Sequence, residues 1–375
     1  MSKLKGNKLQ QTFQKILDYA DIKIDGDNPW DIKIHNKEFY RRVFAHASLG
    51  LGESYMDGWW DCDRLDEFYY KILNAQLQEK VRGRDVFISV LKAKLFNLQK
   101  KARAFEIGKR HYDLGNKLYT YMLDKRMIYS CGYWKNSDNL DDAQESKLDL
   151  TCRKLNLKSG MKILDIGCGW GGFANYAATN FDVSVVGVTV SKEQVVFAKE
   201  LCQGLPVEIR FQDYRDVNEK FDAIVSIGMF EHVGLKNYRT YMRTVDRCLE
   251  DGGLFLLHTI GSDRSLTYPD PWSAKYIFPN SITPSAKQVT NAAEGLFTLE
   301  DWHNFGPDYD KTAMAWHQNF EKNWDKIKND YDNRFKRMWD HFLLRGAGSS
   351  RARHNHLWQI VFSKKGFEGR YHSVR

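Results

Sequence analysis

From residue 161 onward, short apolar runs alternate with amphipathic stretches. The pattern predicts helices at 172–180 and 191–203, set among strands at 162–164, 183–188, 207–211, 221–227 and 253–260. Strands that alternate with helices are typical of a parallel sheet covered by helices on both faces. We therefore expect an α/β domain whose ligand crevice lies at the carboxyl ends of the strands.

The two ends of the chain have different patterns. Residues 357–363 (LWQIVFS) are typical of a last edge strand, and a long helical stretch from about 314 to 344 precedes them. Residues 1–77 mix helical and extended patterns, with a polar turn at 25–29 and a Gly- and Trp-rich stretch, SLGLGESYMDGWWDC. This part of the chain predicts a small α+β domain.

A basic segment follows this N-terminal part. Between residues 80 and 110 there are ten Lys and Arg against two acidic residues, and residues 85–105 place Phe87, Leu91, Leu95 and Leu98 at helical spacing. The segment predicts a basic amphipathic helix. It is either a linker helix that packs on its own protein or a surface that meets anionic lipid headgroups. A nucleic-acid partner is not expected, because no nucleic-acid-binding module accompanies the charge.

Length and composition limit the class of protein. The 375 residues suggest two domains, with an N-terminal domain at 1–100 and a catalytic domain at 101–375. A hydrophobic share of 42% excludes wholesale disorder, and no uninterrupted apolar run of about 18 residues occurs. The opening residues lack the apolar core of a signal peptide, and six scattered Cys without a CxxC pair favour neither zinc nor disulfides. We expect a cytoplasmic protein without a metal.

The first strand runs into a glycine-rich turn that begins at Asp165 and reads DIGCGWGG. Glycines at Gly167 and Gly169 let the chain turn sharply and let a ligand approach the backbone, which implies a nucleotide-like cofactor. The alternative is an ordinary glycine-rich turn. The motif does not satisfy the GxGxxG dinucleotide fingerprint, but DxGCGxG resembles the first motif of class I S-adenosylmethionine (SAM)-dependent methyltransferases.

The later strands end in further polar residues. The second strand ends at Thr189, where most such methyltransferases place an acid, and Ser191 is expected to cap the next helix. The fourth strand leads to Glu231, which we expect at a strand end facing the crevice, where a carboxylate is more often functional than structural. Alternation along the strand would send His232 to the opposite face, where a structural role is expected.

Eight motifs in order resemble the family of bacterial cyclopropane-fatty-acyl-phospholipid synthases, which is related to the mycolic-acid cyclopropane synthases. The resemblance covers essentially the whole chain. One departure is Gly132, where the family commonly has Ala, and we expect it to loosen its loop. The motifs are SLGLGESYMDGWWDC, HYDLGN, IYSCGYW, LDIGCGWGG, VVGVTVS, MFEHVG, LLHTIG and EDWHNFGPDYD.

The resemblance implies a Rossmann-like SAM-dependent methyltransferase domain that converts the cis double bond of a phospholipid acyl chain into a cyclopropane. A carbocation formed on the way needs a dry aromatic pocket, for which Phe230, Tyr129, Trp134 and Tyr276 are candidates, although each is more often simply a core residue. Two alternatives remain open. The chain could be a related SAM-dependent enzyme that leaves a methyl branch on a lipid or methylates a small amine, or a membrane-surface binding protein without activity.

The resemblance also implies the site residues. Bound bicarbonate is the expected base, held by the side chains of Glu231, His258 and Tyr309 and chiefly by backbone groups of Cys131 and Ile260. For Cys131 the alternatives are a buried packing residue and a nucleophile, and the acidic neighbours of Tyr309 indicate a loop. The expected cofactor contacts are Tyr129, Ser130, Asp165, Gly167, Gly169, Thr189, Gln194, Tyr214 and Arg215.

The same resemblance implies the partners. A phospholipid substrate requires contact with a bilayer surface, so we expect peripheral association with the inner face of the cytoplasmic membrane. We also expect a homodimer and no nucleic-acid partner.

Overall fold

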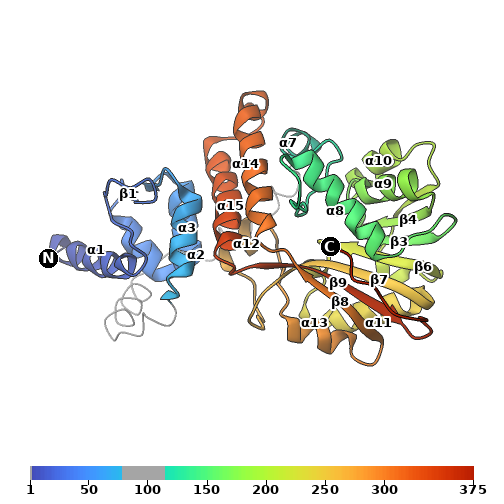
Figure 1. Cartoon of the computed structure of the whole chain (residues 1–375). Helices are drawn as coiled ribbons and strands as arrows, with labels where there is room; N and C mark the ends of the chain where they lie inside the picture. The colour runs from blue at the N-terminus through green and yellow to red at the C-terminus, as the bar shows by residue number, and fades with distance from the viewer. Residues whose placement is uncertain (1, 78–114) are drawn as a thin grey trace. The chain divides into compact units, whose positions relative to one another are not determined.

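The computed structural model describes residues 2–77 and 115–375 (Figure 1). The basic amphipathic helix expected at 85–105 and the domain boundary expected at residue 100 lie outside the described residues. Contacts within the chain define two compact units. Among the described residues, unit 1 contains 2–77, 115, 269–279 and 316–354, and unit 2 contains 116–268, 280–315 and 355–375. Two later segments thus belong to the same unit as the N-terminal part.

Unit 1 combines helices with one small antiparallel pair of strands. Its N-terminal part contains α1 (Ser2–Asp18), β1 (Lys33–Ile34), α2 (Glu38–Met56), β2 (Trp60–Asp61) and α3 (Leu65–Asn74). Phe39, Trp60 and Phe68 lie at the centre of its apolar core. These elements give the mixed α+β character that the sequence predicts.

The later segments add α12 (Pro271–Tyr276), the end of α14 (Asp308–Ile327) and α15 (Asn333–Arg351) to unit 1. The single helical stretch expected at 314–344 is therefore two helices. Asp332 explains the break, because its side chain accepts a hydrogen bond from the Phe335 amide at 2.7 Å and so caps a new helix.

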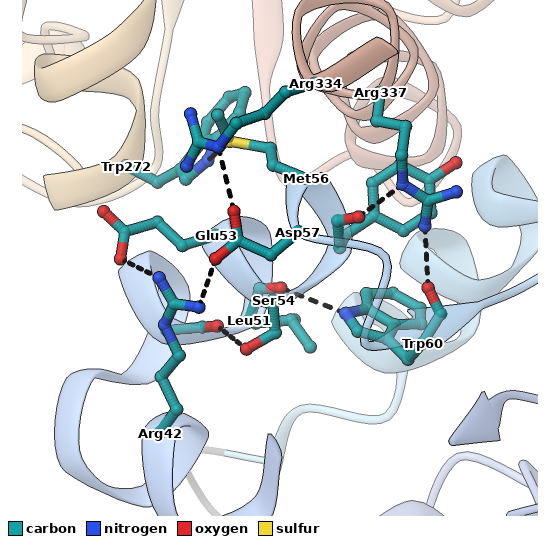
Figure 2. Close-up of polar contacts among 12 residues, drawn as sticks. Arg42, Leu51, Glu53, Ser54, Met56, Asp57, Trp60, Trp272, Arg334 and Arg337 are labelled. Carbon is teal, nitrogen blue, oxygen red and sulfur yellow. Dashed lines mark hydrogen bonds and ion pairs between the residues drawn. The ribbon is translucent and has the colours of Figure 1, made fainter. Parts of the chain in front are cut away.

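A network of ion pairs holds the second half of α2 (Figure 2). Helix α2 is kinked at Ala47, whose φ of 48° lies in the left-handed region. Arg42, before the kink, donates to Glu53 and to Asp57, both at 2.6 Å. Arg334 of α15 donates to the other oxygen of Asp57 at 2.8 Å. These charges tie the two halves of α2 to each other and to α15.

Unit 2 is built on a seven-stranded sheet with the order β5-β4-β3-β6-β7-β9-β8 (Figure 1). The first five of these strands are parallel, whereas β9 is antiparallel to both β7 and β8. The bounds are β3 (Lys162–Ile166), β4 (Ser184–Thr189), β5 (Val207–Phe211), β6 (Phe221–Ile227), β7 (Leu249–Gly261), β8 (Phe297–Asn304) and β9 (His356–Lys364). This arrangement confirms the expected α/β, Rossmann-like fold.

Helices cover both faces of this sheet. On one face, α11 (Tyr238–Cys248) and α13 (Ala286–Ala293) contribute to a buried cluster with Leu164 and Ile166. On the other face, α8 (Leu140–Lys154) and α9 (Gly172–Phe181) contribute to a cluster with Ile163. Alternate residues of β3 therefore point into two cores, as a doubly covered strand requires. Helices α7 (Gly115–Met122) and α10 (Lys192–Leu201) and the first turns of α14 also lie in this part of the chain.

Two expectations about the sheet were wrong. The strand expected at 357–363 exists as β9, but it lies between β7 and β8 and is not an edge. The edge is β8, a strand that the sequence analysis did not predict, because its mixed sequence FTLEDWHN has no clear alternation. The strand expected at 253–260 is also longer, and β7 begins at Leu249.

Among the described residues, no helix is long and apolar enough to span a bilayer.

We predict that Glu53→Gln lowers the free energy of unfolding by about 3 kcal/mol at pH 7. Burial raises the pKa of Glu53, but hydrogen bonds from Lys275, Arg42 and Tyr276 outweigh it and lower the pKa to about 2. This stabilisation is present above the unfolded pKa, near 4.5, and is lost as pH falls through the folded value. In urea titrations, the difference in free energy of unfolding between the wild type and the variant should therefore decrease as the pH is lowered from 7 to 3.

Glu38→Gln on the same helix is the control, because Glu38 forms an exposed pair with Arg41. It should change the free energy of unfolding by less than about 0.5 kcal/mol. An equal effect of both variants would contradict a special role for the Glu53 network.

Candidate active site

The turn after β3 forms a backbone cradle. Gly167, Gly169 and Gly171 have φ values of 81°, 55° and 87°, which L side chains rarely adopt. A Cβ on Gly167 would also lie 2.7 Å from Cγ of Met229. The backbone conformation therefore favours glycine at all three positions, and space adds to this at Gly167 and Gly171 but not at Gly169. Helix α9 begins directly after them.

The end of β4 brings two predicted cofactor residues together. Thr189 Oγ1 donates to Oε1 of Gln194 at 2.7 Å. Ser191 caps α10 by accepting from the Gln194 amide at 3.3 Å, as expected. The hydroxyl–amide pair lies in the position where most SAM-dependent methyltransferases carry an acid.

Past β5, Tyr214 and Arg215 lie in the 3-10 helix η2 (Tyr214–Asp216). The ring of Tyr214 packs edge-on against Tyr241, with centroids 5.3 Å apart. The Arg215 guanidinium is exposed and paired with Asp213 at 2.7 Å. Arg215 is therefore held on the surface by its own neighbour, whereas Tyr214 is anchored to the core.

Asp165 is buried at the end of β3. Its Oδ2 has no hydrogen-bond partner among the residues that the structure describes. Burial raises the pKa of Asp165 to about 7, although the charge of Lys147 opposes the rise. A ligand with a donor group would satisfy this oxygen.

Glu231 lies one turn beyond the strand end where it was expected. Strand β6 ends at Ile227, and Glu231 belongs to the 3-10 helix η3 (Phe230–His232). The turn points Glu231 at β7, where its Oε1 accepts from the amide of Ile260 at 2.6 Å. Burial raises the pKa of Glu231 to about 7 despite this bond, and its Oε2 has no hydrogen-bond partner in the described part of the chain. The side chain of His232 is exposed.

His258 is buried in the middle of the sheet, on β7. Burial lowers the pKa of its imidazole well below the usual value, so the ring is neutral near pH 7. Its Nε2 has no partner among the described residues. The His258 carbonyl accepts from the amide of Gly228 at 2.9 Å, which fixes β7 against the end of β6.

Cys131 and Tyr309 share an apolar cluster with Ile260. Burial raises the pKa of the Cys131 thiol well above its usual range, which favours a packing residue over a nucleophile. The loop expected around Tyr309 is wrong, because Tyr309 lies in the first turn of α14. One turn later, Thr312 Oγ1 accepts from the amide of Gly132 at 3.1 Å.

Gly132 does not loosen this segment as expected. A Cβ there would lie 3.0 Å from Cβ of Ala143, so the glycine allows close packing against α8.

Sequence reasoning missed two polar residues of α8. Lys147 Nζ donates to Oγ of Ser130 at 2.9 Å, and Gln144 Nε2 donates to the Ser130 carbonyl at 2.7 Å. Both side chains are fully buried, and burial lowers the pKa of Lys147 to about 8. Their spacing of three residues on the inner face of a helix is the signal that could have identified them.

Of the proposed aromatic pocket residues, Phe230 is a core residue that stacks on Tyr238, with ring centroids 4.2 Å apart. Tyr276 belongs to unit 1, where its hydroxyl donates to Glu53 at 2.8 Å. Trp134 Nε1 donates to Thr312 at 2.9 Å.

Unit 2 therefore combines the glycine turn after β3 with buried groups whose neutral forms are favoured. Two buried atoms, Glu231 Oε2 and His258 Nε2, are available to a ligand that both donates and accepts hydrogen bonds.

Comparison with known proteins shows which sequences and folds the chain resembles. Residues 99–360 match the family model of mycolic acid cyclopropane synthetase. The chain is 55% identical, over 93% of its length and 92% of the relative, to the cyclopropane-fatty-acyl-phospholipid synthase of Escherichia coli strain K12. It is 38% identical, over 56% of its length and 57% of the relative, to a probable fatty acid methyltransferase of Pseudomonas putida.

Solved structures show the same fold. The cyclopropane synthase MmaA2 of Mycobacterium tuberculosis aligns with a TM-score of 0.64 at 28% identity, covering 72% of this chain and all of that one. The mycolic acid cyclopropane synthase CmaA1, complexed with SAH and CTAB, aligns with a TM-score of 0.62 at 29% identity, covering 71% of this chain and 99% of that one.

We predict that Gly167→Ala weakens SAM binding at least tenfold, because a methyl group would both strain the backbone and displace Met229. Calorimetric titration with SAM measures this. Gly204→Ala is the matched control, since Gly204 has the same positive φ of 82° but open space around it. Equal loss of affinity in both variants would mean that backbone strain alone explains the effect.

We predict that the free energy of unfolding of Glu231→Gln, taken relative to that of the wild type, rises by about 2 kcal/mol when the pH is raised from 5 to 8. The pKa of Glu231 is raised to about 7, so its neutral form favours the folded state, and this contribution is lost as pH rises through 7. Urea titrations at the two pH values test this. Glu250→Gln, at an exposed position, should show no such trend.

Proposed function

The chain belongs to the mycolic acid cyclopropane synthetase family, and on that premise we propose that it is a cyclopropane-fatty-acyl-phospholipid synthase. It transfers a methylene group from SAM to the cis double bond of an unsaturated acyl chain in a membrane phospholipid, giving a cyclopropane lipid and S-adenosylhomocysteine. The observation that carries the proposal is the 55% identity to the Escherichia coli synthase over 93% of the chain.

Orientation is the first requirement of this chemistry. An isolated alkene is a weak nucleophile, and bound SAM supplies an electrophilic methyl group. The chain must therefore hold both partners in line. The glycine turn at Gly167 and Gly169 would offer backbone to the methionine part of SAM, and the bonded pair of Thr189 and Gln194 would meet the ribose hydroxyls. Tyr129, Ser130, Asp165 and Tyr214 complete the proposed cofactor contacts. Arg215 would have to contribute through its backbone or leave its pair with Asp213.

Water exclusion is the second requirement, because methyl transfer leaves a carbocation on the lipid. Cys131, Glu231 and His258 are buried, and burial favours the neutral form of all three groups. A neutral site cannot trap the cation with a thiolate or a fixed carboxylate. This supports Cys131 as a packing and backbone residue of the site.

Removal of a proton is the last requirement, since ring closure needs the new methyl group to lose one. When bound, bicarbonate would supply this base. The residues fit such a ligand once Glu231, whose pKa is about 7, has lost its proton. Its Oε2 can then accept from the hydroxyl of the anion, and His258 Nε2 can donate to one of its oxygens. The Tyr309 hydroxyl is the second proposed donor. Cys131 and Ile260 complete the proposed anion site beside them.

The substrate also determines where the protein works. We propose that the chain binds the inner face of the cytoplasmic membrane, that residues 1–100 serve lipid binding and dimerisation, and that residues 101–375 carry catalysis. The ten basic residues between 80 and 110 support the electrostatic part of this proposal. Binding to anionic vesicles should then weaken as salt is raised.

The test is mass spectrometry of acyl chains after incubation of the full chain with SAM and unsaturated phospholipid vesicles. We expect a gain of one CH₂ unit with loss of the alkene, a lower rate in CO₂-free buffer, and recovery when bicarbonate is added. Glu231→Gln should lower turnover by about two to three orders of magnitude, since it removes the carboxylate that holds the proposed anion.

Three outcomes would contradict parts of the proposal. A gain of CH₂ with the alkene retained would indicate a methyl-branching enzyme. Unchanged lipid with SAM still bound would indicate a small amine acceptor. Ring formation that does not depend on bicarbonate would overturn only the anion site.

A further inference from the structure

We propose that Gln359 and Thr151 set the tautomer of His258, so that the imidazole proton is on Nε2 and points a hydrogen-bond donor into the site. Gln359 is then a positioning residue, because it acts through His258. The placement of the proton is argued from hydrogen-bond geometry alone, whereas its use in turnover rests on the proposed function.

The argument starts at Thr151, which is buried on α8. Its hydroxyl donates to the Lys147 carbonyl, one turn earlier, at 2.8 Å. A hydroxyl has one hydrogen, so toward any other neighbour it can only accept. The side-chain atom of Gln359 that lies 3.0 Å from Thr151 Oγ1 must therefore be the amide nitrogen, Nε2.

The same amide nitrogen faces His258. Nε2 of Gln359 lies 3.5 Å from Nδ1 of His258, a long contact of the kind that tightens when a ligand binds. An amide nitrogen can only donate, so Nδ1 must accept and carries no hydrogen. A neutral imidazole with a bare Nδ1 holds its proton on Nε2. Burial, which lowers the pKa of His258, keeps the ring in that neutral form.

The sheet fixes this pair in register. Strands β7 and β9 are antiparallel, and His258 lies directly opposite Gln359. Both side chains therefore leave the sheet on the same face, against α8. A slip by one residue would turn Gln359 to the other face, so its position is set by the whole ladder.

The N–H group at Nε2 of His258 would donate a hydrogen bond to a ligand in the site. His258 Nε2 is buried without a hydrogen-bond partner among the described residues, and Oε2 of Glu231 is a second such atom. With the proton on Nε2 and Glu231 in its carboxylate form, the two groups present one donor and one acceptor to the ligand. The opposite tautomer would present two acceptors, which a singly protonated oxyanion cannot satisfy.

The test is a long-range ¹H–¹⁵N spectrum of the full chain labelled at histidine, with His258 assigned by its absence in His258→Gln. We expect Nε2 to carry the proton in the wild type. Gln359→Glu replaces the donor by an acceptor, so the proton should move to Nδ1. We expect kcat to fall at least tenfold, with the affinity for SAM unchanged within about twofold.

Three further variants separate an effect on the tautomer from an effect on folding. Thr151→Val removes the acceptor that orients Gln359 and should give mixed tautomers, whereas Thr151→Ser keeps the hydroxyl and should restore the wild-type spectrum. Ser363→Ala is the matched control, because Ser363 is buried on the same strand but bonds to Glu300. It should leave both tautomer and kcat unchanged.

A proton on Nδ1 in the wild type, or an unchanged tautomer in Gln359→Glu, would overturn the proposal. A moved proton with normal kcat would overturn the positioning role. If the wild type forms no cyclopropane, the proposed function fails, while the spectrum still decides the tautomer.

Discussion

The pairing of β7 along both of its edges is the constraint on which the site depends. On one edge it is parallel to β6, which places His258 beside Ile227. On the other it is antiparallel to β9, which places the same residue opposite Gln359. Two residues further along β7, the amide of Ile260 holds Glu231. Side chains from elements more than 100 residues apart thus meet because one strand sets their positions.

A second feature of the site is that burial favours the uncharged forms of its titratable groups. Burial shifts the pKa of Asp165, Glu231 and His258 toward their neutral forms. In unit 1, by contrast, the buried carboxylate of Glu53 stays ionised, because Arg42 and Lys275 donate hydrogen bonds to it. A fully paired carboxylate stabilises a fold, whereas an incompletely paired one can receive a ligand. The two units therefore use buried carboxylates for different purposes.

Much of unit 2 could be predicted because its signals are local. Strands β5 and β6 have the expected bounds, and the glycine turn at Gly167 and Gly169 follows β3 as expected. The place of β9 inside the sheet was not predictable, because strand pairing depends on distant parts of the chain. Gln359 was missed for the same reason, since its role depends on the strand pairing that places it opposite His258. The position of Glu231 was also missed, because the sequence pattern does not show that β6 ends at Ile227 and that a 3-10 helix follows.

The interior position of β9 has a consequence for synthesis of the protein on the ribosome. Until residues 356–364 emerge, β7 has one open edge and β8 has no neighbour in the sheet. Unit 1 is also incomplete until residue 354 has been made. Unit 1 cannot finish folding before residue 354 has been translated, nor unit 2 before β9, so an apolar strand edge stays exposed until then. Such a nascent chain is a natural client for chaperones that shield unpaired strands.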